Sequence, residues 1–108
     1  MDVTFIDCVF NDCIFSEGKI NHVALRTVTF NRCEIKDVNF AMCNKLTEVL
    51  FENCDLYRAE FAKSIANKAN FKTSYNYTID PKTTKLKKAV FSQEGLKGLL
   101  YKHDIIVK

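Results

Sequence analysis

The chain of 108 residues contains no tryptophan, one proline and three glycines, whereas phenylalanine occurs nine times. Such low glycine and proline contents are not typical of a disordered segment or of a loop-rich secreted domain. No apolar run approaches the roughly 20 residues that span a bilayer, and no secretion-type leader pattern opens the sequence. We therefore expect one soluble, cytoplasmic domain with a filled core and no membrane partner.

The sequence also lacks the motifs on which common catalytic sites depend. It has no glycine-rich phosphate loop, no nucleophile elbow and no paired-carboxylate signature. The two histidines, His22 and His103, have no motif around them and are interpreted as surface residues. No Cys-x-x-Cys pair occurs among the five cysteines. We expect no enzymatic activity, no cofactor and no bound metal.

A large apolar residue recurs at every fifth position of the first part of the chain. The positions are Phe5, Phe10, Phe15, Ile20, Leu25, Phe30, Ile35 and Phe40. A second track, two places earlier, holds small or β-branched residues such as Cys13 and Val28. Two inward positions two residues apart suit a very short strand, because alternate side chains share a face. The remaining residues must turn a corner, so the chain should coil about an axis as a β-solenoid, with coils about 4.8 Å apart.

This five-residue unit resembles the repeat of the pentapeptide-repeat family, in which a small residue, a polar residue and a Leu or Phe precede two variable positions. The units that carry the resemblance, within residues 3–91, are CVFND, CIFSE, VTFNR, VNFAM, CDLYR, AEFAK and ANFKT. The resemblance implies an all-β fold, a right-handed quadrilateral β-helix with four units in each coil. Residues 1–91 should then form about four to five coils, and residues 92–108 a C-terminal cap. Because the repeat begins at once, a longer parent protein is an alternative that the sequence leaves open.

The rhythm of the repeat slips once. After Phe40 the step of five reaches Lys45, which an apolar core cannot hold, and the pattern resumes at Leu46. One inserted residue explains the slip. With it, the predicted columns are Phe10, Phe30, Phe51, Phe71 and Phe91 on one face, Phe15, Ile35 and Leu56 on another, and Ile20, Phe40 and Phe61 on a third.

The pattern changes towards the C-terminus. The repeat weakens at Ala66 and Asn76, and residues 79–85, IDPKTTK, are interpreted as a turn because proline fixes φ and removes a backbone donor. After Ser92, a candidate helix cap, three leucines adopt helical spacing, Leu96, Leu99 and Leu100. We predict a helix of about ten residues and a short strand at residues 105–107, which together close the end of the solenoid.

The cysteines follow the small inward track. The four that do so are Cys8, Cys13, Cys33 and Cys54, and Cys43 would join them if the first register ran one unit further. We interpret them as core residues that remain thiols in a reducing cytoplasm and that resist thiol reagents in the folded state.

Charge is distributed unevenly. Residues 1–61 carry ten acids and six bases, whereas residues 62–108 carry ten lysines and three acids. The face of Phe15 should display the candidate partner-binding residues Glu17, Glu34, Asp37, Asp55 and Tyr57, with Tyr75 and Tyr77 further along. The alternative is that these side chains are ordinary solvent-exposed residues of the solenoid wall and bind no partner. The later lysines, Lys82, Lys85, Lys87 and Lys88, are assigned to a turn without interleaved aromatics, so we expect no direct contact with nucleic acid.

Two functions remain open. The first is a non-catalytic, rigid scaffold for a protein partner that the sequence does not identify. The second comes from the stretch LKKAVF through GLLYKHDIIV, which is similar to the end of the quinolone-resistance-type members of the family. That resemblance implies a DNA-mimicking regulator of DNA gyrase, a type II topoisomerase, although the net charge of +3 argues against mimicry. From the apolar stripe of the C-terminal helix we also expect a homodimer, with candidate contact residues Leu96, Leu99, Leu100 and Tyr101. The alternative is that this helix is only an intramolecular cap.

Overall fold

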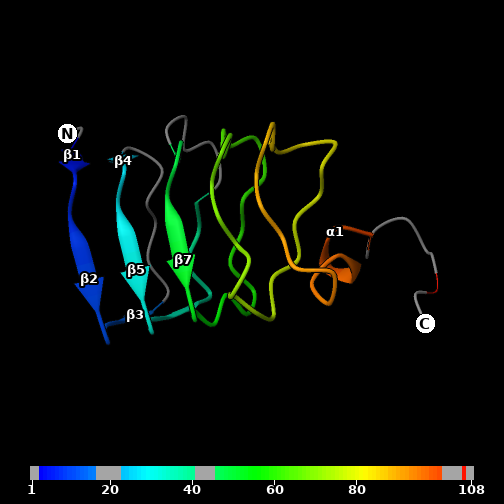
Figure 1. The fold of residues 1–108 in the computed structure, drawn as a ribbon, viewed down its shortest axis with the longest axis horizontal. Coiled ribbons are helices and arrows are strands. Elements are labelled where there is room, and N and C mark those ends of the chain that lie inside the picture. The colour runs from blue at the N-terminus through cyan, green and yellow to red at the C-terminus, as the bar shows by residue number, and fades with distance from the viewer. Residues whose placement is uncertain (1–2, 17–22, 41–45, 101–105, 107–108) are drawn as a thin grey trace.

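The computed structural model describes residues 3–16, 23–40, 46–100 and 106. Within these residues the chain forms an elongated solenoid of short strands, measuring 41 × 26 × 25 Å (Figure 1). Its strands are β1 (Val3–Ile6), β2 (Val9–Asn11), β3 (Ile14–Ser16), β4 (Val23–Arg26), β5 (Thr29–Asn31), β6 (Glu34–Lys36) and β7 (Leu50–Glu52). A short helix, α1 (Lys97–Leu100), lies at the C-terminal end.

Strands in successive coils pair in parallel. Phe10 of β2 pairs with Phe30 of β5, twenty residues later, and Phe30 pairs with Phe51 of β7, twenty-one residues later. The longer second step confirms the predicted inserted residue, and the insertion falls in the interval that contains residues 41–45, outside the described residues. Beyond β7 the ladder continues as single bridges, such as Asp55 to Tyr75. The chain is therefore the predicted right-handed quadrilateral β-helix.

The four sides of the solenoid are named here by their strands. Three of them are the β1–β4 face, the β2–β5–β7 face and the β3–β6 face. The fourth face carries no strand among the described residues and is centred on Phe40 and Phe61, whose rings stack at 5.1 Å. Each face name also includes the residues of later coils whose core residues lie in the same column.

A column of phenylalanine rings fills the β2–β5–β7 side of the core, as predicted. Successive rings lie 5.1 to 5.3 Å apart and within 14° of parallel, for Phe10, Phe30, Phe51, Phe71 and Phe91. Rings of the fourth face meet this column edge-on, as Phe40 meets Phe51 at 6.0 Å. Each aromatic pair adds about 0.5–1.5 kcal/mol beyond the burial of its area. The core is therefore a regular stack that leaves little freedom to the wall around it.

The small inward track contributes hydrogen bonds as well as volume. The thiol of Cys54 donates to the carbonyl of Phe30 at 3.2 Å, and the hydroxyl of Thr84 donates to the carbonyl of Phe61 at 2.9 Å. Ser74 donates in the same way to the carbonyl of Phe51. These buried donors are thus satisfied, as buried polar groups must be.

The cysteines differ in burial. Cys33 and Cys54 are fully buried, which confirms their predicted place in the core, whereas Cys8 and Cys13 are only half-buried. The difference arises because the first described coil has a neighbouring described coil on one side only. Cys43 lies outside the described residues.

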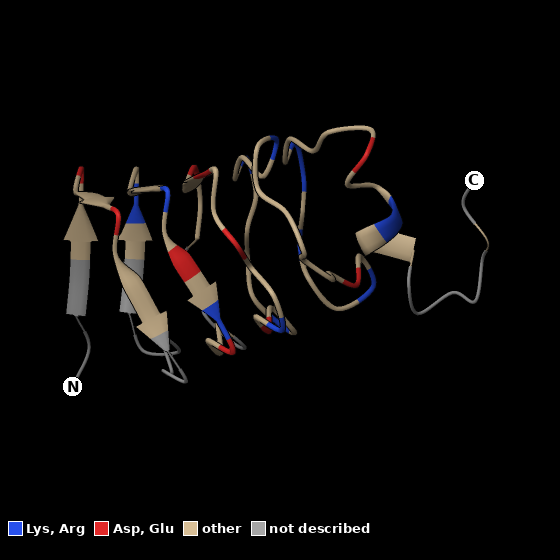
Figure 2. Ribbon diagram, turned by 90° about the horizontal axis from the view of Figure 1, so that it is seen from below, with Lys and Arg blue, Asp and Glu red and all other residues tan. Residues whose placement is uncertain are grey.

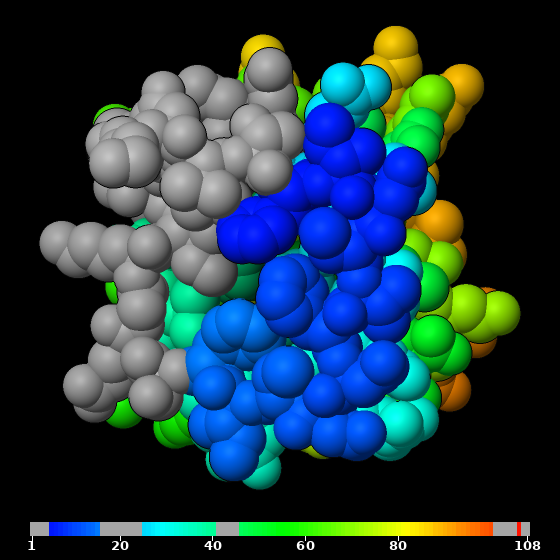
Figure 3. Space-filling view, turned by 90° about the vertical axis from the view of Figure 1, so that its left-hand side faces the viewer, coloured from blue at the N-terminus to red at the C-terminus, as the bar shows by residue number. Residues whose placement is uncertain are grey.

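The first coil is also the least covered part of the apolar core. Figure 3 looks onto this N-terminal end, where the dark blue coil forms the surface. Phe10 is only partly buried there, whereas Phe30 and Phe51 in the next coils are 2% exposed or less. Core residues in the middle coils should therefore contribute more to stability than the matching residues of the first coil.

The fourth coil keeps the twenty-residue register in its bridges and departs from the five-residue pattern locally, at Asn76. Ala66 is fully buried in the column of Leu46, so the expected weak point there is a well-packed small residue. At the second weak point, Asn76 adopts a left-handed φ of 62°, and the next residue, Tyr77, turns inward. Tyr77 is 4% exposed and its ring lies 5.9 Å from that of Phe71. The prediction that Tyr77 is displayed on the surface is therefore wrong.

The region after Tyr77 forms the expected turn. The amides of Thr83 and Thr84 both donate to the carbonyl of Asp80, at 3.1 and 3.0 Å, and Pro81 is exposed at the bend. The turn ends earlier than predicted, because Lys85 already forms a bridge to Ile65 in the coil below. The lysines after it, Lys87 and Lys88, lie on the corner turn of the next coil.

The C-terminal helix is shorter than predicted. Ser92 accepts a hydrogen bond from the amide of Gly95 at 3.1 Å, so it caps the turns that lead into α1 and not α1 itself, which begins at Lys97. From Ser92 to Leu99 the backbone bonds join residues three apart, the pattern of tight 3₁₀ turns. Two glycines in this stretch, Gly95 and Gly98, also have low helix propensity. The predicted strand at residues 105–107 lies outside the described residues except for Ile106, which is exposed.

Candidate interaction surface

The β3–β6 face carries most of the predicted partner-binding residues. Glu34, Asp55 and Tyr75 occupy the same outward position in three successive coils, because Glu34 bridges to Asp55 and Asp55 to Tyr75. Tyr57 follows two residues after Asp55 and is 52% exposed. Glu17 lies outside the described residues. The face therefore changes along its length from acidic to aromatic.

The acids on this face are largely neutralised by neighbouring bases. Lys36 lies 3.6 Å from the carboxylate of Asp55, and Arg58 lies 3.2 Å from that of Asp37. Acidic and basic segments consequently lie side by side along this side of the solenoid (Figure 2). Glu34 is exposed. The described part of the face therefore does not present a continuous row of negative charge.

The Asp55 side chain forms hydrogen bonds within the wall of the solenoid. Its side chain is 14% exposed and accepts hydrogen bonds from the backbone amide of Tyr57 and the side-chain amide of Asn76, both at 3.1 Å. The bond to Asn76 links two coils at the point where the chain departs from the five-residue pattern. Asp55 is thus better placed to orient Tyr57 and Asn76 than to meet a partner directly.

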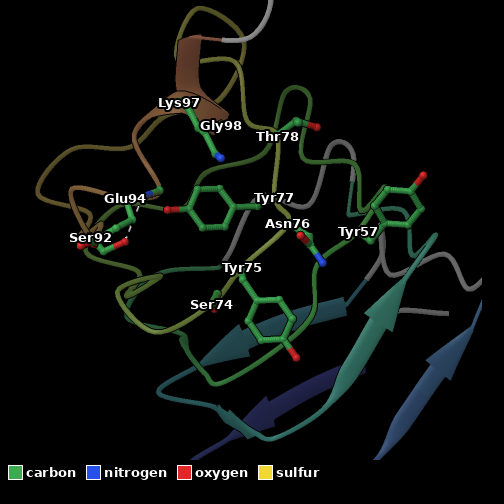
Figure 4. A pocket seen from close by; sticks show the side chains of 11 residues that line it. Tyr57, Ser74, Tyr75, Asn76, Tyr77, Thr78, Ser92, Glu94, Lys97 and Gly98 are labelled. Atoms are coloured by element: carbon green, nitrogen blue, oxygen red, sulfur yellow. Dashed lines mark hydrogen bonds between the residues drawn. The ribbon is translucent and has the colours of Figure 1, made fainter. Parts of the chain in front are cut away.

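A groove of about 550 Å³ lies where the β3–β6 face meets the C-terminal cap (Figure 4). Two tyrosines at its rim, Tyr57 and Tyr75, are 52% and 51% exposed. The cap supplies the opposite rim with Glu94 and Lys97, one acid and one base. The full lining is Tyr57, Ser74, Tyr75, Asn76, Tyr77, Thr78, Ser92, Glu94, Gly95, Lys97 and Gly98.

The floor of the groove is built by Tyr77 and two glycines of the cap. A Cβ atom on Gly95 would lie 1.7 Å from the Tyr77 hydroxyl, and one on Gly98 would lie 2.3 Å from the Tyr77 carbonyl oxygen. The Gly98 carbonyl accepts a hydrogen bond from the amide of Ile79 at 2.9 Å. Because a side chain at either position would overlap Tyr77, these glycines let the cap pack closely on the fourth coil, Gly95 against the Tyr77 side chain and Gly98 against its backbone.

The Tyr77 hydroxyl is enclosed by this contact. Its oxygen is buried and makes no well-formed hydrogen bond within the described residues. Burial raises the pKa of the Tyr77 phenol, and the nearby Ser92 hydroxyl only partly opposes the rise. The phenol therefore stays protonated at neutral pH and acts as a packing element of the cap.

The predicted dimer residues occupy different environments. Leu99 packs against the core and Leu100 is half-buried, whereas Leu96 is 44% exposed. Tyr101 lies outside the described residues. The cap therefore uses part of its leucine stripe to cover the last coil and leaves Leu96 at the surface.

The sequence prediction missed the contact of Tyr77 with Gly95 and Gly98. A signal was available, since two of the three glycines in the chain lie three residues apart in this cap. The buried partner could not be found from the count of five, because that count placed Asn76 and not Tyr77 in the core.

The described residues offer no group of three or more His, Cys, Asp or Glu side chains that could hold a metal ion. Two of the hydroxyls that line the groove form hydrogen bonds with the backbone: Ser74 donates to a carbonyl, and Ser92 accepts from the amide of Gly95. In the same part of the chain, no helix has the length and apolar character needed to cross a bilayer.

Comparison with known proteins identifies the repeat. The family model described as a pentapeptide repeat region matches residues 3–76. A search of curated proteins found no match.

Among solved structures, two trypsin-treated forms of QnrB1, a plasmid-mediated fluoroquinolone resistance protein, are 11% and 12% identical, with TM-scores of 0.45 and 0.42. Each alignment covers 97% of this chain and 80% of QnrB1. HetL, a pentapeptide repeat protein involved in heterocyst differentiation regulation in the cyanobacterium Nostoc, is 12% identical with a TM-score of 0.39. That alignment covers 81% of this chain and 39% of HetL. Because the family model matches more than half of the sequence, this chain belongs to the pentapeptide-repeat family.

Proposed function

We propose that this pentapeptide-repeat protein is a non-catalytic, rigid scaffold that docks a protein partner in the groove at the end of its β3–β6 face. The observation that carries the proposal is the pair of half-exposed tyrosines, Tyr57 and Tyr75, at the rim of a groove of about 550 Å³. Tyrosine is enriched at protein interfaces, because it offers a large amphipathic surface and loses little conformational entropy.

The wall behind the tyrosines favours this role. Stacked rings such as Phe51 and Phe71, 5.2 Å apart, hold the coils in register, and Gly95 and Gly98 fix the cap against Tyr77. A preorganised surface binds with a smaller entropic cost than one that must order on contact. With one acid and one base at the cap rim, the groove suits a partner segment that is polar and close to neutral.

Affinity capture from a lysate, with the wild type and variants of the groove rim as bait, tests the scaffold role. A partner retained by the wild type should be lost about tenfold or more with the double variant Tyr57→Ala, Tyr75→Ala, the effect of removing interface anchor residues. The matched control is Val90→Ala, since Val90 is 42% exposed on the neighbouring β2–β5–β7 face. Equal capture by the tyrosine variant, or equal loss with the control, would overturn the proposal.

Regulation of DNA gyrase is the alternative, and it rests on the similarity of the C-terminal stretch alone. A mimic of duplex DNA needs rows of unpaired acids, whereas Asp37 and Asp55 are paired with Arg58 and Lys36. Purified DNA gyrase can be added to the same capture experiment. Binding that survives removal of the tyrosines but is lost with Glu34→Gln would favour the gyrase function over the scaffold groove.

We also propose a homodimer through the C-terminal segment. Leu96 remains 44% exposed beside Leu99, which packs on the core. An apolar residue at the end of a solenoid can be buried in a two-fold contact with its copy. This assembly would place two grooves near one symmetry axis.

A further inference from the structure

The last two coils carry an unusual concentration of lysines on the β1–β4 face. Four exposed lysines of this face form what we call the basic face, Lys68, Lys85, Lys87 and Lys88. Two more, Lys63 and Lys82, are exposed at the adjoining corner, where the amide of Lys63 donates to the carbonyl of Thr83. The ladder holds the basic face together, because Lys85 bridges to Ile65 and the amide of Lys68 donates to the carbonyl of Lys87 at 2.8 Å.

The charge of the residues at the corner of this face changes from negative to positive along the solenoid. Its left-handed residues run, coil by coil, through Asp7, Thr27, Glu48, Lys68 and Lys88, with φ between 55° and 62°. A left-handed conformation is unfavourable for a lysine, yet Lys68 and Lys88 both adopt it and both are exposed. The carboxylate of Glu48 lies 4.0 Å from the Lys68 ammonium, and both side chains are more than half exposed. Such an exposed contact is weak, so a phosphate can compete with Glu48 for the Lys68 ammonium.

We propose that the basic face binds the phosphate backbone of a duplex nucleic acid without reading its sequence. This proposal reverses the expectation of no nucleic-acid contact, which assumed that Lys85, Lys87 and Lys88 lie on a turn. In the structure Lys85 forms a bridge of the ladder, whereas Lys87 and Lys88 lie on a turn, at the corner of a coil of the rigid wall. Lysine ammonium groups bind phosphate as point charges, and neutralising several phosphates releases counterions.

The other surroundings of the basic face favour a duplex over other anions. No large hydrophobic side chain of the described β1–β4 face in the last two coils is among the exposed ones, so nothing there could insert into a lipid interface. The exposed tyrosines, Tyr57 and Tyr75, lie on the β3–β6 face, so no aromatic platform for unstacked bases accompanies these lysines. Contacts with the phosphate backbone of a duplex need neither an inserted apolar side chain nor an aromatic platform.

Fluorescence anisotropy with a labelled DNA duplex of about 20 base pairs tests the proposal. With about four phosphate contacts, the slope of log affinity against log salt should be near −3.6, and the affinity should fall about 100-fold between about 50 and 200 mM salt. Lys87→Gln should make this slope less negative by about one. The triple variant Lys85→Gln, Lys87→Gln, Lys88→Gln should remove most of the binding.

Lys72→Gln is the matched control. Lys72 and Lys87 are both exposed and each directly follows a core residue, Phe71 and Leu86, but Lys72 lies on the β2–β5–β7 face. Lys72→Gln should leave the salt slope unchanged, and Lys87→Arg should keep it, since any cation can meet a phosphate.

Three results would overturn the proposal: no binding of wild type at the lowest salt, equal loss with Lys72→Gln, or equal binding to phosphatidylserine vesicles with the same dependence on Lys87. Circular dichroism melts of each variant separate loss of contact from loss of fold. The basic face is distinct from the tyrosine groove, so failure here leaves the scaffold proposal untouched.

Discussion

The Tyr77 hydroxyl lies directly beneath Gly95, so close that a Cβ on residue 95 would fall 1.7 Å from the oxygen. Figure 4 shows the Tyr77 ring reaching from the fourth coil towards the cap. The same ring lies 5.7 Å from that of Phe91. One side chain therefore joins the ring column of the solenoid to the cap and forms the floor of the groove.

Gly95→Ala should destabilise the protein by about 1–3 kcal/mol, because the added methyl group overlaps the Tyr77 phenol. Tyr77→Phe removes the overlapping oxygen but leaves the ring carbon 2.7 Å from the new atom. In a double-mutant cycle followed by urea unfolding, the two substitutions together should cost clearly less than their sum. Additive costs, within about 0.5 kcal/mol, would show that the contact is not formed.

Phe51→Ala should lower the free energy of unfolding by roughly 3–5 kcal/mol, as truncation of a buried aromatic side chain does. Phe51 is fully buried, with stacked rings on both sides. Phe10→Ala in the first coil is the control and should cost less, because Phe10 is only partly buried and has one stacked neighbour among the described residues. A cost below about 1 kcal/mol for Phe51→Ala would refute the column.

The stability of the protein should depend on Cys54 at alkaline pH. Burial raises the pKa of the Cys54 thiol from 9.0 to about 11. The folded state therefore holds this proton more tightly than the unfolded state, so the contribution is complete below about pH 9 and is lost as the pH rises to about 11.

The Cys54→Ser variant isolates this effect, because a serine hydroxyl does not titrate there and can donate as Ser74 does. Urea unfolding across this range should show the wild type losing more free energy of unfolding than the variant. Parallel pH profiles would contradict the burial of the thiol.

Leu96→Glu should convert the proposed dimer into a monomer without unfolding it, since Leu96 is 44% exposed. Light scattering at tens of micromolar protein gives the mass of both forms. Leu99→Glu is the informative contrast, because Leu99 packs on the core and its substitution should lower the melting temperature as well. A wild type that is monomeric at that concentration would leave α1 as an intramolecular lid.

The period of five residues, with one inserted residue after Phe40, was sufficient to predict the columns of the core. It places Phe30, Phe51 and Phe71 without any knowledge of the structure, because each coil repeats the same inward position. It fails at Tyr77, since the chain departs from the five-residue pattern at the left-handed corner of Asn76 and the composition alone does not show where a corner falls.

The candidate site was only partly predictable. The count of five placed Tyr57 and Tyr75 outward, and both are about half exposed. It did not show that Lys36 would lie 3.6 Å from Asp55, because that distance depends on the inserted residue between their coils. The groove itself depends on how the cap docks onto Tyr77, a contact between segments with different periods.

The central claim is that a protein partner docks between Tyr75 and the cap. The most direct measurement replaces Tyr75, and separately Val90, with a photo-crosslinking phenylalanine analogue and compares the adducts formed with the captured partner. Tyr75 lines the groove, whereas Val90 is comparably exposed on the neighbouring face. The account predicts a partner adduct from position 75 and none from position 90. An adduct from position 90 alone, or equal yields from both positions, would contradict it.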